Sequence, residues 1–259
     1  MALFDDILAL VKPERVLLDP AATGAGVKVC VVDSGIERGL LAEKHGAIVP
    51  IEGAVFQPGG AAPLPDDGKQ STPHGTTVAD IILKLAPRAQ LFSADVFGPQ
   101  GSCEVETVIQ AIRHAVNVWQ CKVINLSLGV PESKLQPVAR RLQLQRAVEE
   151  AYYRDVLIVA AADNDHPFTR SYPAGFAPPL LSVDKGLFAD PLQAAYRLRE
   201  QIEFQAHAKG YLGPFAAEPA TSWAAPHLAG IAARLLSLEP NLKPFEIKTL
   251  IYWLFRERR

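Results

Sequence analysis

The chain has 259 residues, 49% of them hydrophobic, and a formal net charge of −2. This length and composition suffice for a full buried core, and no repeat or run of charge divides the chain into two domains. The near-neutral mixture of charges offers no electrostatic basis for binding nucleic acid or a membrane surface. We therefore expect neither partner, and the function has to be inferred from a site.

The N-terminus and the cysteines bear on the cellular compartment. The first ten residues lack a basic segment and a small-residue cleavage site, and no apolar run approaches the length of a membrane span. Cys30, Cys103 and Cys121 are odd in number and form no Cys-x-x-Cys pair, so neither a disulfide framework nor a zinc site is indicated. These features predict an unexported protein of the reducing cytoplasm, without a metal or cofactor.

The chain begins with a predicted arm, residues 1–22, in which a short amphipathic helix is broken by Pro13, and the main domain is predicted to follow at 23–259. Val27–Val32 is a nearly continuous β-branched run that ends in Asp33, a pattern typical of a buried parallel strand with a carboxylate at its C-terminal edge. Residues 50–73 are rich in Pro, Gly and Asp, which predicts a surface loop.

Strands and helices then alternate along the chain. Alternation at these lengths predicts a parallel sheet with helices on both faces, and a site at the carboxyl ends of the strands. Residues 184–219 have weak periodicity and receive no assignment. The other predicted elements are strands at 90–97, 122–128 and 156–162, and helices at 74–87, 105–119, 135–153, 222–236 and 244–255.

The segment Ala220–Gly230 presents the Ser222 hydroxyl at the start of an apolar helix, and Pro226 is expected in the first turn of that helix. Free N–H groups and the helix dipole there favour developing negative charge, as an acyl-transfer nucleophile and its oxyanion require. The alternative is that Ser222 serves only as an N-cap.

Four residues together supply the parts of an acyl-transfer site: Asp33, His74, Asn164 and Ser222. Their order is the one used by the subtilisin clan. The surrounding sequence resembles the subtilisin-like serine proteases (the subtilase family) over roughly residues 24–255. The segments that carry the resemblance are Val29–Gly35, His74–Thr76, Val123–Gly129, Val159–Asn164, Ser171–Pro173 and Thr221–Gly230.

The resemblance implies an α/β fold of one domain, with a subtilisin-like, doubly wound, mostly parallel sheet between helices. It also implies a serine endopeptidase that acts through an acyl-enzyme on a peptide or protein. Asp33, His74 and Ser222 match the catalytic triad, and Asn164 matches the side-chain donor to the oxyanion. The two segments that pair with an extended substrate are matched by Gly101, Ser102 and Cys103 and by Ser127, Leu128 and Gly129.

Two further residues bear on specificity by the same resemblance. The strand that ends at Asp163 and the segment Ser127–Gly129 match walls of the pocket for the residue on the acyl side of the cleaved bond, and Ser171 matches a position near its floor. A carboxylate in that pocket predicts a preference for Arg or Lys. The alternative is that Asp163 points away, where it caps the turn at Asn164 or pairs with Arg170.

The sequence also departs from the family pattern. Thr77 stands where a second His is usual, Ala220 and Asp163 each stand where Gly is usual, and the helix after His74 lacks the usual calcium loop. The last departure predicts that the tight calcium site is missing.

Three functions are alternatives for this sequence. The first is a cytoplasmic endopeptidase, either a maturation enzyme that removes the leader of a precursor peptide or a general protease. The second is a pseudoprotease that only binds peptides. The third is another acyl-transfer enzyme such as an esterase, which should carry a Gly-x-Ser-x-Gly motif that Ala220–Ala224 does not match.

Overall fold

The computed structural model describes residues 12–46, 50–60, 62–98, 101, 103–214 and 217–256. Nine strands form one sheet in the order β10-β11-β9-β7-β5-β1-β4-β2-β3. All of its strand pairs are parallel except β2–β3 and β10–β11. The nine strands are β1 (Lys28–Asp33), β2 (Glu52–Val55), β3 (Leu64–Pro65), β4 (Gln90–Asp95), β5 (Val123–Leu126), β7 (Leu157–Ala161), β9 (Leu181–Gly186), β10 (Ala194–Arg199) and β11 (Ile202–His207).

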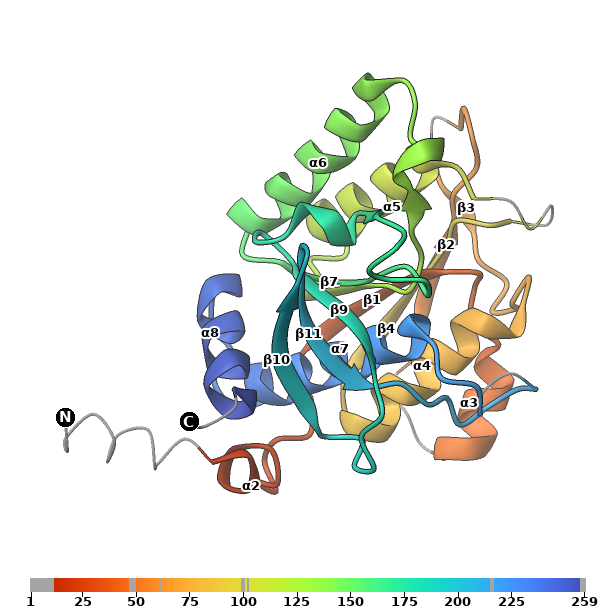
Figure 1. Cartoon of the computed structure of the whole chain (residues 1–259). Coiled ribbons are helices and arrows are strands. Elements are labelled where there is room, and N and C mark those ends of the chain that lie inside the picture. Colours follow the sequence, from red (N-terminus) through yellow and green to blue (C-terminus); the bar gives the residue numbers. More distant parts are fainter. Residues whose placement is uncertain are drawn as a thin grey trace.

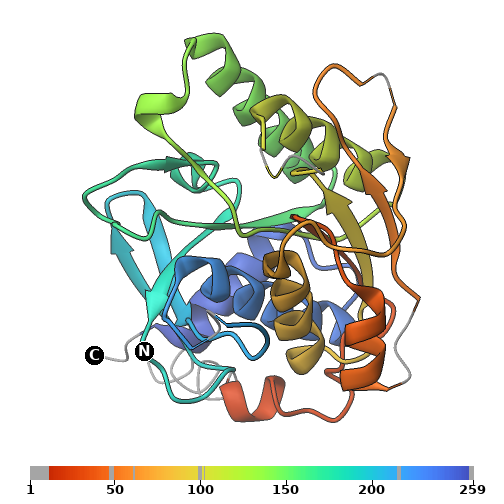
Figure 2. The ribbon, with the colours of Figure 1, turned by 90° about the vertical axis from the view of Figure 1, so that its right-hand side faces the viewer.

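Helices cover both faces of the sheet, as Figure 2 shows, so the predicted fold class is confirmed. Helices α4 and α7 pack on one face, together with α8, while α5 and α6 pack on the other (Figure 1). The described helices are α2 (Pro13–Val16), α3 (Arg38–His45), α4 (Pro73–Leu85), α5 (Val105–Asn117), α6 (Val138–Tyr153), α7 (Thr221–Leu238) and α8 (Pro244–Phe255).

The β-branched run of β1 lies in the middle of the sheet because both of its faces are apolar. Val29 and Val31 belong to the core under α4 and α7, whereas Cys30 and Val32 belong to the core under α5 and α6. After β4 the chain crosses to the other side of β1 and continues outward through β5 and β7. The sheet therefore has its switch point at the carboxyl end of β1, where such folds bind ligands.

Several predictions about local structure need correction. Residues 50–73 are not only loop, because β2 and β3 form there and pair with the sheet. The unassigned segment 184–219 contains β10, β11 and the end of β9. Pro226 lies inside α7, beyond the first turn in which we expected it.

The helix predicted before Pro13 falls on residues 1–11, which lie outside the described residues. Pro13, which we expected to end that helix, is the first residue of the short helix α2. The following residues pack on the domain: Leu17 is buried in the core, and its carbonyl accepts a hydrogen bond from the Arg234 guanidinium of α7 at 2.8 Å. Within the described residues, no helix is both long and apolar enough to cross a bilayer.

Candidate active site

The carboxylate at the end of β1 holds an imidazole. Asp33 is 1% exposed, and Nδ1 of His74 lies 2.9 Å from both of its oxygens. The Ser34 backbone N–H donates to Oδ1 of Asp33 at 2.8 Å, so the carboxylate keeps one orientation. Because a carboxylate accepts but does not donate, this contact places the proton of His74 on Nδ1 and leaves Nε2 free to act as a base.

The electrostatics of His74 follow from this pair. Burial lowers the pKa of His74, but the charge of Asp33 and the hydrogen bond to it outweigh burial, so the pKa is raised above its ordinary value. The imidazole is still 34% exposed on its side-chain surface, which leaves it accessible to a substrate.

The position of His74 at the start of α4 depends on its neighbours. Thr72 caps the helix by accepting a hydrogen bond from the His74 backbone N–H, and Pro73 occupies the first helical position. Gly75 leaves no room for a side chain, since a Cβ there would lie 2.3 Å from the Gly35 carbonyl oxygen. Glycine at position 75 therefore allows the start of α4 to lie against the end of β1, which brings the neighbouring His74 to Asp33.

Ser222 is the second residue of α7, and Ala220 occupies the N-cap position, so the interpretation of Ser222 as an N-cap is wrong. Pro226 has no N–H to donate to the Ser222 carbonyl one turn earlier. The Ser127 hydroxyl donates to that carbonyl instead, at 2.8 Å, and Ser127 in turn accepts from the Asn125 side chain at 2.9 Å. Pro226 therefore leaves the Ser222 carbonyl without its helical donor. Ser127, which directly follows β5, binds this carbonyl and so holds the backbone of the candidate nucleophile in place.

Asn164 replaces the missing side-chain cap of α7. Its Oδ1 accepts from the backbone N–H and the hydroxyl of Thr221, at 3.0 and 3.1 Å. Its Nδ2 then remains free to donate, next to the first turn of the helix that carries Ser222. Among the described residues, no hydrogen bond joins the Ser222 hydroxyl to His74, although such bonds often tighten only when substrate is bound.

The two predicted substrate segments are only partly described, because Ser102 lies outside the described residues. Gly101 adopts a φ of 66° in a turn, and Cys103 is half-buried, with a pKa raised to about 12 chiefly by burial. On the other segment, Leu128 packs against the core under α5 and α6, as Cys103 does from the first segment. Gly129 adjoins Ser171, since a Cβ on Gly129 would lie 3.3 Å from the Ser171 hydroxyl oxygen.

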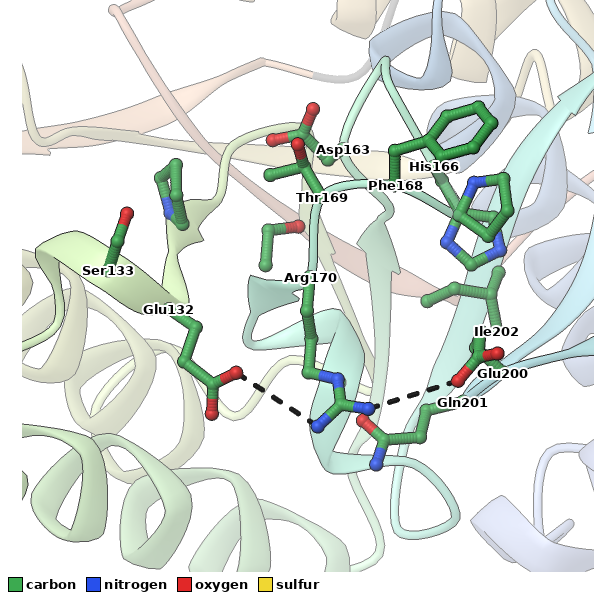
Figure 3. Close-up of a pocket in the computed structure, with 14 residues that line it drawn as sticks. Glu132, Ser133, Asp163, His166, Phe168, Thr169, Arg170, Glu200, Gln201 and Ile202 are labelled. Atoms are coloured by element: carbon green, nitrogen blue, oxygen red, sulfur yellow. Dashed lines mark ion pairs between the residues drawn. The ribbon is translucent and has the colours of Figure 1, made fainter.

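A cavity of about 560 Å³ opens beside this edge of the sheet and is lined by Asp163, by residues 166–171, which include Arg170 and Ser171, and by residues 131–133, 175 and 200–202. Figure 3 shows that Arg170 reaches toward Glu132 and Glu200, at 4.0 and 3.8 Å, and not toward Asp163. Asp163 accepts from the backbone N–H of Asp165 at 2.9 Å. It therefore caps its own turn and lines the cavity as well, while the predicted alternative pairing with Arg170 is absent among the described residues.

Sequence reasoning missed Glu132, Glu200 and Trp223, and it named Arg170 only as an alternative partner of Asp163, not as part of a charged lining. The three charged residues come from separate segments, and only the folded chain brings them together. Trp223 was visible in the sequence directly after Ser222, but its contact with the His74 ring was not. A second cavity, of about 220 Å³ and mostly apolar, is lined by both of these rings and by Leu212 and Pro214.

The chain thus combines two features that define its class: an α/β fold with a mostly parallel sheet, and a site at the carboxyl edge of that sheet. The site consists of the buried Asp33, its partner His74 and Ser222 at the start of α7. The chain matches the model of the subtilase family over residues 24–186 and 200–254, and it belongs to that family.

The chain is 32% identical over 241 residues to subtilisin Savinase of Lederbergia lenta, a match that covers 87% of this chain and 82% of that protein. It is equally similar to the M-protease of Shouchella clausii, but it spans only 58% of that relative's length. Among solved structures, the S41 psychrophilic protease has a TM-score of 0.70 at 24% identity, and sphericase a TM-score of 0.68 at 23%. Both matches cover 92% of this chain and 86% of the other, and they support the fold.

Proposed function

We propose that the protein is a serine endopeptidase in which Asp33, His74 and Ser222 act as the triad. The observation that carries the proposal is the contact of His74 Nδ1 with both oxygens of the buried Asp33, at 2.9 Å. This contact leaves Nε2 of His74 as the base. Membership of the subtilase family supports the same chemistry.

In the proposed reaction, Oγ of Ser222 attacks the peptide carbonyl and passes its proton to Nε2 of His74. Asp33 holds the imidazole and stabilises the imidazolium that forms. The oxyanion accepts hydrogen bonds from Nδ2 of Asn164 and from the backbone N–H of Ser222, which lies in the first turn of α7 and has no partner among the described residues. His74 then gives the proton to the leaving amine, and water releases the acyl group from Ser222 by the reverse steps.

We further propose that the substrate is a peptide or protein held in extended form between residues 101–103 and 127–129. The residue on the acyl side would enter the cavity beside Asp163 and Ser171. Its lining carries the carboxylates of Glu132, Asp163 and Glu200 against the guanidinium of Arg170. Glu132 also pairs with Arg141 at 2.9 Å, so the remaining balance is slightly negative and favours a basic side chain.

A finer proposal concerns the setting of the activity. Cys30, Cys103 and Cys121 are free thiols, which suits a reducing cytoplasm, and there the enzyme would remove the leader of a precursor peptide. Cell fractionation would test the location. Incubation with candidate precursors, followed by mass spectrometry, would distinguish one defined cut from general degradation.

The rival proposal is a pseudoprotease that binds peptides without cleaving them. The observation in its favour is that the Ser222 hydroxyl has no hydrogen bond to His74 within the described residues. Reaction with a fluorophosphonate probe separates the two, because only an activated serine is labelled. We expect the parent to be labelled, Ser222→Ala to be unlabelled, and Ser237→Ala, a matched change at the far end of α7, to react like the parent. An unlabelled parent would support the pseudoprotease.

A further inference from the structure

The residue that follows the candidate nucleophile packs against the candidate base. The indole of Trp223 and the imidazole of His74 have ring centroids 4.9 Å apart and planes inclined by 31°. Trp223 is only 6% exposed. One face of the imidazole is therefore covered by an aromatic face that belongs to the same helix as Ser222.

Hydrogen bonds hold Trp223 at two points. Its Nε1–H donates to the Glu218 carbonyl at 3.1 Å, and its own carbonyl lies 2.7 Å from Nδ1 of His227. A carbonyl can only accept, so Nδ1 of His227 carries the proton, and Nε2 accepts from the Tyr211 hydroxyl at 3.1 Å. His227 is fully buried, and burial lowers its pKa to about 3, so this chain of hydrogen bonds stays neutral and fixed at working pH.

An aromatic face attracts a cation whose centre lies within about 6 Å of the ring centroid, and the attraction is stronger where water is excluded. In the proposed mechanism His74 alternates between a neutral base and an imidazolium. We propose that Trp223 is a positioning residue for His74: its indole restricts rotation of the imidazole and stabilises the imidazolium. This inference rests on the proposed triad, but its central measurement does not require turnover.

The charged groups around His74 allow the contribution of Trp223 to be isolated. Asp33 faces the imidazole from β1, while the first turns of α4 and α7 contain no acidic residue. Tyr211, on the neighbouring loop, has its pKa raised to about 12, mainly by burial, and is neutral. Replacing Trp223 therefore leaves the Asp33 charge in place.

The first test compares Trp223→Leu, which removes the aromatic face, with Trp223→Phe, which keeps one. For Trp223→Leu we expect kcat on a peptide substrate to fall about fivefold or more, with KM changed less than about twofold. The acidic limb of the pH profile should move to lower pH by about half a unit. Trp223→Phe should recover most of both properties. Equal behaviour of the two variants would overturn the inference.

The second test titrates His74 by NMR in a Ser222→Ala background, where no turnover is needed. We expect the His74 pKa to fall when Trp223→Leu is added and to recover with Trp223→Phe. The matched control is Trp119→Leu, which removes a buried indole that stacks on Phe92 under the opposite face of the sheet, at 5.2 Å. That control should lower the melting temperature without moving the His74 pKa.

The outcomes separate the two proposals. An unchanged His74 pKa in folded Trp223→Leu would overturn the inference even if the parent is an active protease. A parent that does not react with fluorophosphonate would overturn the proposed function, and the titration would still decide the role of Trp223. If Trp223→Leu fails to fold, Trp223→Met replaces it, because the unbranched Met side chain adapts better to an irregular gap while it also lacks an aromatic face, and it carries the same expectation.

Discussion

The proposed catalytic edge, which is the carboxyl edge of the sheet where Asp33, His74 and Ser222 lie, and the cavity of about 560 Å³ beside it are built from different kinds of structure. Asp33, His74 and Ser222 stand at the ends of β1, α4 and α7, whose other residues form the core. The cavity is lined mainly by loop residues, including Phe168, which is 92% exposed. The difference indicates that core packing fixes the arrangement of the proposed triad, whereas the cavity proposed to receive the substrate is built mainly from loops, which can change at little cost to stability.

The largest expected effect breaks the catalytic edge at its buried carboxylate. Asp33→Asn should lower kcat by about 10⁴, because an amide no longer holds the required tautomer of His74. The pH dependence of the residual activity should change as well. Neutral His74 is the base, so activity rises with pH through its pKa, and Asp33 is what raises that pKa against burial. Without the charge, the acidic limb should move to lower pH in a profile of kcat/KM.

Asp155→Asn is the matched control for that change. Asp155 pairs with Lys243 at the far end of α6, and its φ of 60° is one that Asn tolerates well. Its activity and pH profile should equal those of the parent. A loss below tenfold in Asp33→Asn, or an acidic limb that stays in place, would remove Asp33 from the triad.

The second expected effect separates the two roles of Asn164. Asn164→Ala removes both the acceptor that caps α7 and the free donor, so we expect kcat to fall about 10²- to 10³-fold and the helix cap, worth about 1 kcal/mol, to be lost. Asn164→Asp keeps the acceptor and removes the donor. Its melting temperature should stay close to that of the parent while its kcat falls at least as far. If Asn164→Asp retained full kcat, Asn164 would be a cap and nothing more.

The third expected effect concerns the cavity and leaves the catalytic edge intact. Peptides that differ only at the residue on the acyl side of the cut should be cleaved faster with Arg or Lys than with Leu, by a ratio on the order of tenfold. Asp163→Asn should reduce that ratio, and Arg170→Gln should increase it, because Arg170 repels a basic side chain. Faster cleavage of Leu, with a ranking that Asp163→Asn does not alter, would rule out the electrostatic explanation.

The same contrast explains how far the sequence could predict the structure. Local signals predicted several elements correctly: β1 has a continuous apolar run, and α4, α5 and α8 show the 3.6-residue period of a helix. Two of these elements, β1 and α4, carry Asp33 and His74. The short strands β2 and β3 and the β10–β11 hairpin lack such a signal, because tertiary pairing and not local pattern stabilises them. Specific contacts were equally inaccessible. Neither the Trp223–His74 contact nor the hydrogen bond from the Ser127 hydroxyl to the Ser222 carbonyl can be derived from spacing alone.

The smallest expected effect concerns the helix that carries His74. Helix α4 runs without interruption from Pro73 to Leu85. The calcium loop that we expected to be missing, because it interrupts the corresponding helix in many members of the family, is therefore not part of α4. No group of three or more potential metal-ligating side chains was found among the described residues. Because only an ion that is bound to the folded state stabilises it, we expect EDTA to change the melting temperature by less than about 2 °C. A large drop that calcium reverses would show that carboxylates elsewhere in the chain hold an ion that matters to the fold.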